Sequence, residues 1–172
     1  MVKNRFIEKL GRFATLDGAD EAELTHATAR VRGVGPRQDL IREGDEPGPV
    51  FVILEGWAFR YKILPNGTRQ VLAYLMPGDS CDLHIGLLAE MDHSIQSVTD
   101  LRYATIDRVQ MDEMMNRCRN IAKAMYVGQL VDEGIMRAWI TSMGRRASVE
   151  RVAHLMCELY VRARNIGLID GK

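Results

Sequence analysis

The amino-acid sequence predicts a mainly β protein with α-helices, in which an antiparallel β-sandwich or barrel lies between short N-terminal helices and a long helical region. Three observations support this fold class. Glycine and proline are frequent between residues 31 and 107, where they separate short runs of β-type residues. Residues 119–143 contain no proline and have the periodicity of one long helix. Residues 147–164 carry a second apolar stripe at helical spacing.

The composition is that of a globular protein with one domain, or one domain and part of another, because 47% of the 172 residues are hydrophobic. No apolar run reaches the roughly 18 residues of a membrane span, and the N-terminus lacks the apolar core of a signal peptide. The three cysteines are widely spaced, which fits a reducing compartment. We therefore expect a cytoplasmic protein without a membrane partner.

The net charge of zero conceals an asymmetry. Residues 1–100 carry 11 Lys and Arg against 15 Asp and Glu, a net charge of −4, so residues 101–172 carry +4. Two interpretations stay open for the basic half. It is either a solvated helix face or an end of the molecule that approaches nucleic acid.

The first thirty residues are predicted to be helical. Phe6, Leu10 and Phe13 recur at helical spacing, and residues 17–20 form a turn and cap before a short acidic helix over 21–29. The β region follows, with strand-like runs at residues 50–54, 58–64, 69–75, 94–98 and 103–106.

One hairpin is predicted with particular clarity. Phe59, Tyr61 and Ile63 alternate with basic residues, which is typical of a half-buried strand. Asn66 and Gly67 lie between this run and the next, and this dipeptide favours a tight primed turn with two positive φ angles.

The helix over 119–143 carries an apolar stripe with steps of three and four residues, the spacing of a coiled-coil seam. We expect this stripe to form a homodimer interface, with packing against the chain's own β region as the alternative. The predicted seam consists of Ile121, Ala124, Gly128, Val131, Ile135, Ala138 and Ser142. Gly144 is predicted to end the helix, and the amphipathic helix over 147–164 has little apolar surface left to cover it.

Five short motifs occur in an order that resembles the CRP/FNR superfamily of bacterial transcription regulators. They are IREGD (41–45), VILEG (52–56), GTRQVL (67–72), PGD (77–79) and ERVAHLM (150–156). The resemblance implies a jelly-roll β-barrel similar to cyclic nucleotide-binding domains. It implies a sensor domain over 1–118, a dimerisation helix over 119–144, and the first helix of a winged-helix DNA-binding domain over 145–172.

The resemblance also implies a function. The chain is expected to be the effector-sensing and dimerisation part of a regulator, in which a ligand in the β-roll is coupled through the dimer helix to DNA binding. The chain ends where the family's helix-turn-helix continues, so we expect this polypeptide to lack sequence-specific DNA binding. A stand-alone sensor that binds a protein partner is the alternative. The sequence contains no catalytic motif or nucleophile–base pair, so we expect no enzyme activity.

The expected ligand site follows the Pro-Gly-Asp turn. The resemblance places the ligand contacts at Gly78, Cys81, Asp82, Leu83, His84, His93 and Ser94, with Met136 and Arg137 added from the long helix. In nucleotide-binding members a Glu binds the ribose and an Arg binds the cyclic phosphate. Leu83 and His93 occupy those two positions here, and each lost charge-assisted bond costs about 1.5–3 kcal/mol. The sequence therefore predicts an effector other than a cyclic nucleotide and leaves its identity unknown.

Haem or metal binding is the alternative for this segment. Cys81 and His84 supply a thiolate and an imidazole, and the haem-based carbon monoxide sensor of the superfamily carries a similar pair with a spacing shorter by one residue. The competing interpretation places Cys81 in the core and gives His84 a structural hydrogen bond. Residues 1–80 contain no cysteine, which excludes the N-terminal cluster of the iron–sulfur members.

Overall fold

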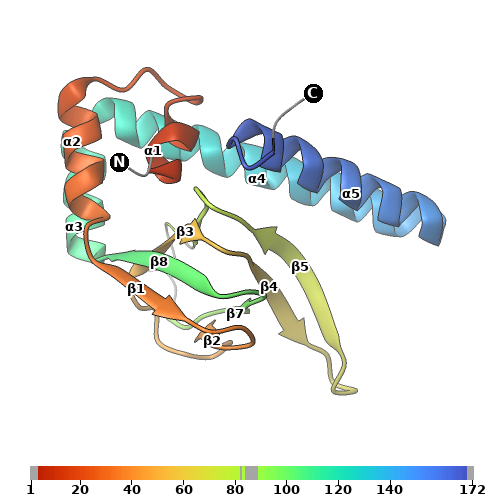
Figure 1. Cartoon of the computed structure of the whole chain (residues 1–172). Coiled ribbons are helices and arrows are strands. Elements are labelled where there is room, and N and C mark those ends of the chain that lie inside the picture. Colours follow the sequence, from red (N-terminus) through yellow and green to blue (C-terminus); the bar gives the residue numbers. More distant parts are fainter. Residues whose placement is uncertain (1–3, 82, 84–88, 170–172) are drawn as a thin grey trace.

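The structure, a computed structural model, describes residues 4–81, 83 and 89–169. In this part of the chain the β region lies between N-terminal and C-terminal helices, as the sequence predicts (Figure 1). The helices are α1 (Arg5–Leu10), α2 (Gly18–Ala27), α3 (Arg108–Arg117), α4 (Arg119–Arg145) and α5 (Ser148–Asn165). The strands are β1 (Val31–Val34), β2 (Asp39–Ile41), β3 (Val50–Glu55), β4 (Ala58–Ile63), β5 (Arg69–Leu75), β6 (Ser80–Cys81), β7 (Ser94–Ser97) and β8 (Leu101–Ile106).

The strands form two four-stranded antiparallel sheets with the orders β1-β8-β3-β6 and β2-β7-β4-β5. A core cluster joins them and includes Ile53, Cys81 and Ile95, all fully buried. The jelly-roll type of fold is thus confirmed. Over the described residues the ladders do not close into one barrel, which corrects that part of the prediction. The edge strands β2 and β6 have three and two residues, too few to carry a continuous ladder around the roll.

The β4–β5 hairpin forms where the sequence predicts it, but its turn is different. Gly67 has a φ of +78°, whereas Asn66 is not among the residues with positive φ. The Gly67 amide donates to the Leu64 carbonyl at 2.8 Å, and the Leu64 amide donates to Thr68 O at 2.8 Å. This is a three-residue loop, because Pro65 favours a type I turn that Gly67 then closes.

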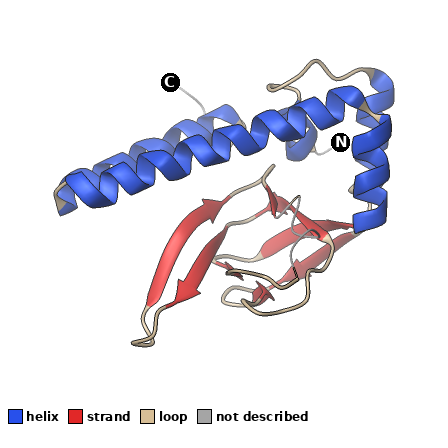
Figure 2. Cartoon of the chain, turned by 180° about the vertical axis from the view of Figure 1, so that it is seen from behind, coloured by secondary structure: helices blue, strands red, loops and turns tan. Residues whose placement is uncertain are grey.

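The helices pack on the sheet that contains β3 and β8. Phe6 of α1, Leu24 of α2 and Ile121 of α4 are almost fully buried in one cluster with Val52 and Ile106. Helix α5 turns back and runs beside α4 in both views (Figures 1 and 2). Gly144 lies inside α4, which continues to Arg145, so the expected helix end is displaced by two residues.

The predicted dimer seam faces the chain's own interior. Ile121 and Ala124 are 0% exposed in the helix-covered core, and a Cβ at Gly128 would lie 3.3 Å from the Phe13 ring. Ile135 lines a cavity, and Ser142 is buried. Ile121, Ala124 and Ser142 are thus covered within one chain, whereas Gly128 and Ile135 are partly buried and their place in a seam between copies stays a prediction. The N-terminal helix and the roll supply apolar surface that the pattern of α4 alone does not reveal.

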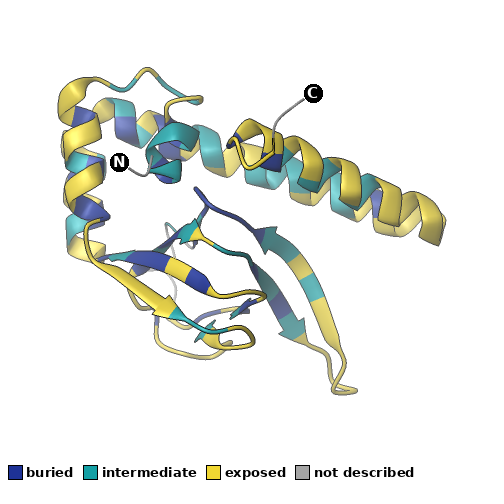
Figure 3. Cartoon of the chain, in the orientation of Figure 1, coloured by how far each residue is buried: buried dark blue, intermediate teal, exposed yellow. Residues whose placement is uncertain are grey.

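A different apolar stripe of α4 is exposed. It comprises Tyr126, Leu130, Met136, Ile140 and Met143, each at least half exposed. Of the predicted seam, Ala138 is partly buried and Val131 is exposed, on the side of α4 away from this second stripe. Most of α5 is exposed as well (Figure 3). In the described part of the chain, none of the helices has the length and apolar character to cross a membrane.

Candidate functional site

A cavity of about 620 Å³ lies between the β-roll and the helices. Its walls come from β4 and β5, from the turn before β6, from α1, and from the middle of α4, with Arg162 of α5 at one side. Apolar side chains supply most of the exposed wall area, and charged residues from both the roll and the helices lie between them. Volume and lining are those of a small-molecule site.

Asp79 is the centre of the polar wall. Its side chain is buried, and its Oδ1 accepts from Lys9 Nζ of α1 at 2.7 Å. Its Oδ2 accepts from Arg162 Nη2 of α5 at 2.7 Å and from the Met76 amide at 2.8 Å. Burial by itself raises the pKa of Asp79, but Lys9 and Arg162 outweigh burial and hold this pKa below its ordinary value. One carboxylate therefore joins α1, the turn and α5.

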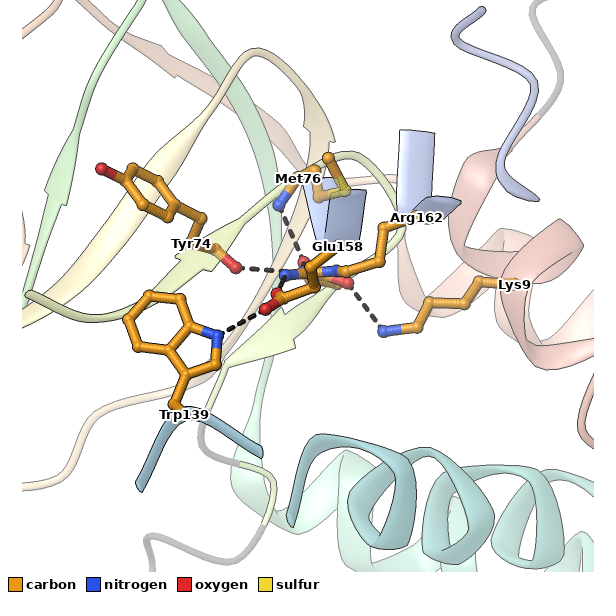
Figure 4. A network of polar contacts seen from close by, with 7 residues as sticks. Lys9, Tyr74, Met76, Trp139, Glu158 and Arg162 are labelled. Atoms are coloured by element: carbon orange, nitrogen blue, oxygen red, sulfur yellow. Dashed lines mark hydrogen bonds and ion pairs between the residues drawn. The ribbon is translucent and has the colours of Figure 1, made fainter. Parts of the chain in front are cut away.

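Arg162 anchors α5 to the roll (Figure 4). Besides Asp79, its guanidinium donates to the Tyr74 carbonyl at 2.9 Å and to Glu158 Oε1 at 3.1 Å. Glu158 in turn accepts a hydrogen bond from the Trp139 indole of α4. Such a planar, multiply bonded guanidinium fixes orientation as well as position.

Gly78 lets the turn approach α1. Its φ is +94°, and a Cβ at this position would lie 2.8 Å from the backbone oxygen of Arg5. We expect Gly78→Ala to lower the free energy of unfolding by about 2–3 kcal/mol, because backbone strain and a clash add. Gly44→Ala is the control, since Gly44 has a φ of +86° but open space around it. Urea unfolding should show a smaller loss for Gly44→Ala, and equal losses would contradict the clash.

The Asp79 cluster makes stability depend on pH. Because the folded-state pKa of Asp79 lies below the unfolded value of 3.8, its contribution is complete above that value and is lost as pH falls through the folded-state pKa. We expect the unfolding free energy of the wild type to fall more steeply below pH 4 than that of Asp79→Asn. Urea midpoints at several pH values measure this, and parallel curves would show that Asp79 contributes nothing.

The structure brings together some of the predicted ligand residues. Gly78, Leu83, His93 and Met136 line the cavity. The side chain of His93 is mostly buried, and its Nδ1 lies 2.6 Å from Asp92 Oδ1. Their role in binding a ligand stays a prediction.

Other predicted residues lie elsewhere. Cys81 is fully buried between the sheets, and Ser94 Oγ accepts from the Glu43 amide at 2.9 Å. Arg137 is exposed and pairs with Glu133 at 3.5 Å. These three do not line the cavity, because their side chains serve the roll core, a loop and the helix surface.

Asp82 and His84 lie outside the described residues, so the Cys81–His84 metal or haem site stays a prediction. Among the described residues, no three His, Cys, Asp or Glu side chains are close enough to hold a metal ion.

Besides Asp79, the described part of the chain contributes six charged residues to the wall, and sequence reasoning assigned none of them to the site: Lys9, Arg60, Asp92, Asp132, Glu133 and Arg162. Four of them lie on helices, namely Lys9, Asp132, Glu133 and Arg162. Asp79 was recognised only as part of a turn motif. Each of the four on helices appears in the sequence as an ordinary surface charge. No local signal separates them from their neighbours, because only the packing of three helices on one turn brings them together.

A β-roll with a small cavity between its turn and a long helix places this protein in the class of domains with the cyclic nucleotide-binding type of fold. Residues 31–118 match the cyclic nucleotide-binding domain family. The chain belongs to this family, and its predicted kinship with CRP/FNR-type regulators is confirmed by its relatives.

Two curated relatives illustrate that kinship. The transcriptional activatory protein AadR of Rhodopseudomonas palustris is 38% identical over 64 residues, which are 37% of this chain and 26% of AadR. The nitrogen fixation regulation protein FixK of Bradyrhizobium diazoefficiens is 23% identical over 140 residues, which are 81% of this chain and 58% of FixK. The chain thus spans only part of the length of these relatives.

Solved structures show the same fold. FixK2 from Bradyrhizobium japonicum superposes with a TM-score of 0.69 at 20% identity, covering 77% of this chain and 66% of FixK2. The c-di-GMP responsive regulator CLP from Xanthomonas campestris superposes with a TM-score of 0.69 at 15% identity, covering 83% of this chain and 72% of CLP.

Proposed function

We propose that this chain is the effector-sensing and dimer-forming part of a cytoplasmic transcription regulator of the CRP/FNR type. The observation that carries the proposal is the position of Asp79. This carboxylate lies in the cavity wall and also holds Arg162 of α5 at 2.7 Å. A molecule that enters the cavity therefore meets the group that fixes α5.

Coupling between effector binding and DNA binding needs an effector that prefers one arrangement of the helices over another. The cavity is suited to this, because α1, α4, α5 and β5 each contribute to its wall. A ligand that changes the Asp79 cluster changes how firmly α5 is held. Allosteric couplings of 1–3 kcal/mol are typical, and the cluster contains several charge-assisted bonds of that order.

The dimer contact is assigned to the exposed stripe of α4 and not to the seam predicted from the sequence. Tyr126, Leu130 and Ile140 are 55%, 61% and 67% exposed, and they occupy one side of the helix. By the resemblance, DNA is contacted by a helix-turn-helix reader that is joined to this module. The relatives named above are transcription regulators, so a regulatory and not an enzymatic role is proposed.

A reporter experiment tests the proposal. The chain is fused behind a DNA-binding domain that represses its promoter only as a dimer. We expect repression by the wild-type fusion and a changed level for Ala73→Trp, because Ala73 lines the cavity and the larger side chain fills it. Val109→Trp, at a 65% exposed site, is the control. Absence of repression, or identical repression by both tryptophan variants and the wild type, would refute the proposal.

A further inference from the structure

The charged groups of the cavity wall are mostly paired with one another. Lys9 and Arg162 both bind Asp79 at 2.7 Å, and His93 lies 2.6 Å from Asp92. These groups are therefore committed to the protein. A ligand that bound them would have to break bonds that hold α1 and α5 to the roll.

Asp132 of α4 is different. It lines the same cavity and is partly buried, yet within the described residues its carboxylate forms no hydrogen bond or ion pair. A carboxylate has about four acceptor sites, and none of those of Asp132 is used by a described residue. Asp132 is thus the group of the wall with acceptor capacity left for a ligand.

The electrostatic surroundings of Asp132 support this distinction. Burial raises the pKa of Asp132, and the repulsion by Asp79 acts in the same direction. Lys9, Arg60 and Arg162 act in the opposite direction but do not outweigh burial. The cations of the wall therefore leave the Asp132 carboxylate short of compensation, so a cation from the ligand would be stabilised there.

The apolar residues of the cavity wall indicate which kind of group the ligand carries besides its charge. Apolar side chains line the cavity beside Asp132: Phe13, which follows α1, Leu72 and Leu75 of β5, and Ile135 and Met136 of α4. An apolar or aromatic group buried against such side chains is stabilised by its removal from water. The combination of one acceptor and an apolar wall is typical of a site for an amphiphilic molecule.

We propose that the cavity binds a small amphiphilic cation, whose ammonium head pairs with Asp132 and whose apolar body packs between α1, β5 and α4. The inference rests on the proposed sensing function and names the chemical class of its effector. An anionic head beside Asp132 is disfavoured, because Glu133 lies next to it and Lys9 and Arg162 remain bound to Asp79, which leaves Arg60 of β4 as the remaining cation of the wall. The same binding event places a positive charge next to the cluster that holds α5.

Three indole compounds that differ in the charge of their side chain test whether the ligand is a cation. Their binding to the whole chain is measured by titration calorimetry at pH 8. They are tryptamine, a cation, tryptophol, which is neutral, and indole-3-acetate, an anion. We expect tryptamine to bind at least tenfold more tightly than indole-3-acetate, with tryptophol between them, because a charge-assisted bond to a partly buried carboxylate is worth about that factor.

Variants separate Asp132 from the rest of the surface. Asp132→Asn should weaken tryptamine binding at least tenfold, Asp132→Glu should retain most of it, and Asp112→Asn, an exposed site on α3, should leave it unchanged. Asp132→Asn should fold normally, because it removes a partly buried charge and keeps the shape. Circular dichroism before each titration verifies this.

Several outcomes would overturn the assignment. These are a preference for indole-3-acetate, equal binding of tryptamine and tryptophol, tryptamine binding that is insensitive to Asp132→Asn, or no tryptamine binding. Each of them leaves the reporter experiment of the proposed function unaffected. The experiments can therefore refute the cationic ligand without refuting the sensing function, and the reverse.

Discussion

In the Arg162→Gln variant, the amides of α5 are expected to lose about thirtyfold of their protection against hydrogen exchange. The glutamine cannot replace the bonds to Asp79, the Tyr74 carbonyl and Glu158. Removing a hydrogen-bonded charge of this kind costs about 2 kcal/mol, which corresponds to about thirtyfold in the opening equilibrium. The remaining apolar contacts of α5 are few, since only Ala163 of this helix is buried.

Both tryptophans of the chain provide a second measurement of the same event. The Trp139 indole is hydrogen-bonded to Glu158 of α5, and Trp57 packs against the cluster of Met76, Ala163 and Ile166. We expect a red-shifted emission in Arg162→Gln, because loss of α5 exposes both indoles to water. Arg151→Gln is the matched control on the same helix, since Arg151 is exposed and pairs only with Ser148 in the described structure. Unchanged exchange and emission in Arg162→Gln would show that α5 is held by other contacts.

Leu130→Lys is expected to convert a dimer into a monomer at micromolar concentration. Leu130 is 61% exposed and lies in the exposed stripe of α4, so two copies that pair along this stripe would bury two lysine charges. Such charges in the centre of an interface cost several kcal/mol, enough to raise the dissociation constant by a factor of 100 or more. Size-exclusion chromatography with light scattering measures the mass directly.

Two further substitutions decide between the exposed stripe and the predicted seam. Val149→Lys on α5 changes an 80% exposed residue that does not belong to the exposed stripe of α4, and it should leave the mass unchanged. Ile121→Lys should unfold the protein instead of dissociating it, because Ile121 is 0% exposed within the core of one chain. A folded Ile121→Lys monomer, or a Leu130→Lys dimer, would favour the seam predicted from the sequence as the dimer interface.

The elements of the fold were predictable because their signals are local. The alternation of Phe59, Tyr61 and Ile63 requires only neighbouring residues, and so does the turn chemistry at Gly67. The proline-free helix over 119–143 is a property of one continuous segment, and it appears as α4 with a difference of two residues at its end. The order of motifs added the jelly-roll topology, which the comparisons confirm.

The site was predictable only in part. The Pro-Gly-Asp turn drew attention to Gly78, which lies in the cavity wall, but Asp79 acts through partners from helices near both ends of the chain. Lys9 and Asp79 are separated by 70 positions in the sequence, and Arg162 follows Asp79 by 83. No spacing rule connects residues across such distances, because the connection is made by three-dimensional packing.

The sequence by itself determined the strands, the long helix and the kind of fold, since periodicity and turn residues act over a few positions. Only the tertiary structure decided which side of α4 is covered and which charges meet at Asp79. An apolar stripe shows that a helix has a buried side, and the partner of that side depends on surfaces that fold onto it from elsewhere. Here α1 and the roll cover Ile121 and Ala124 of the stripe that resembled a seam, and Tyr126, Leu130 and Ile140 remain exposed on another side.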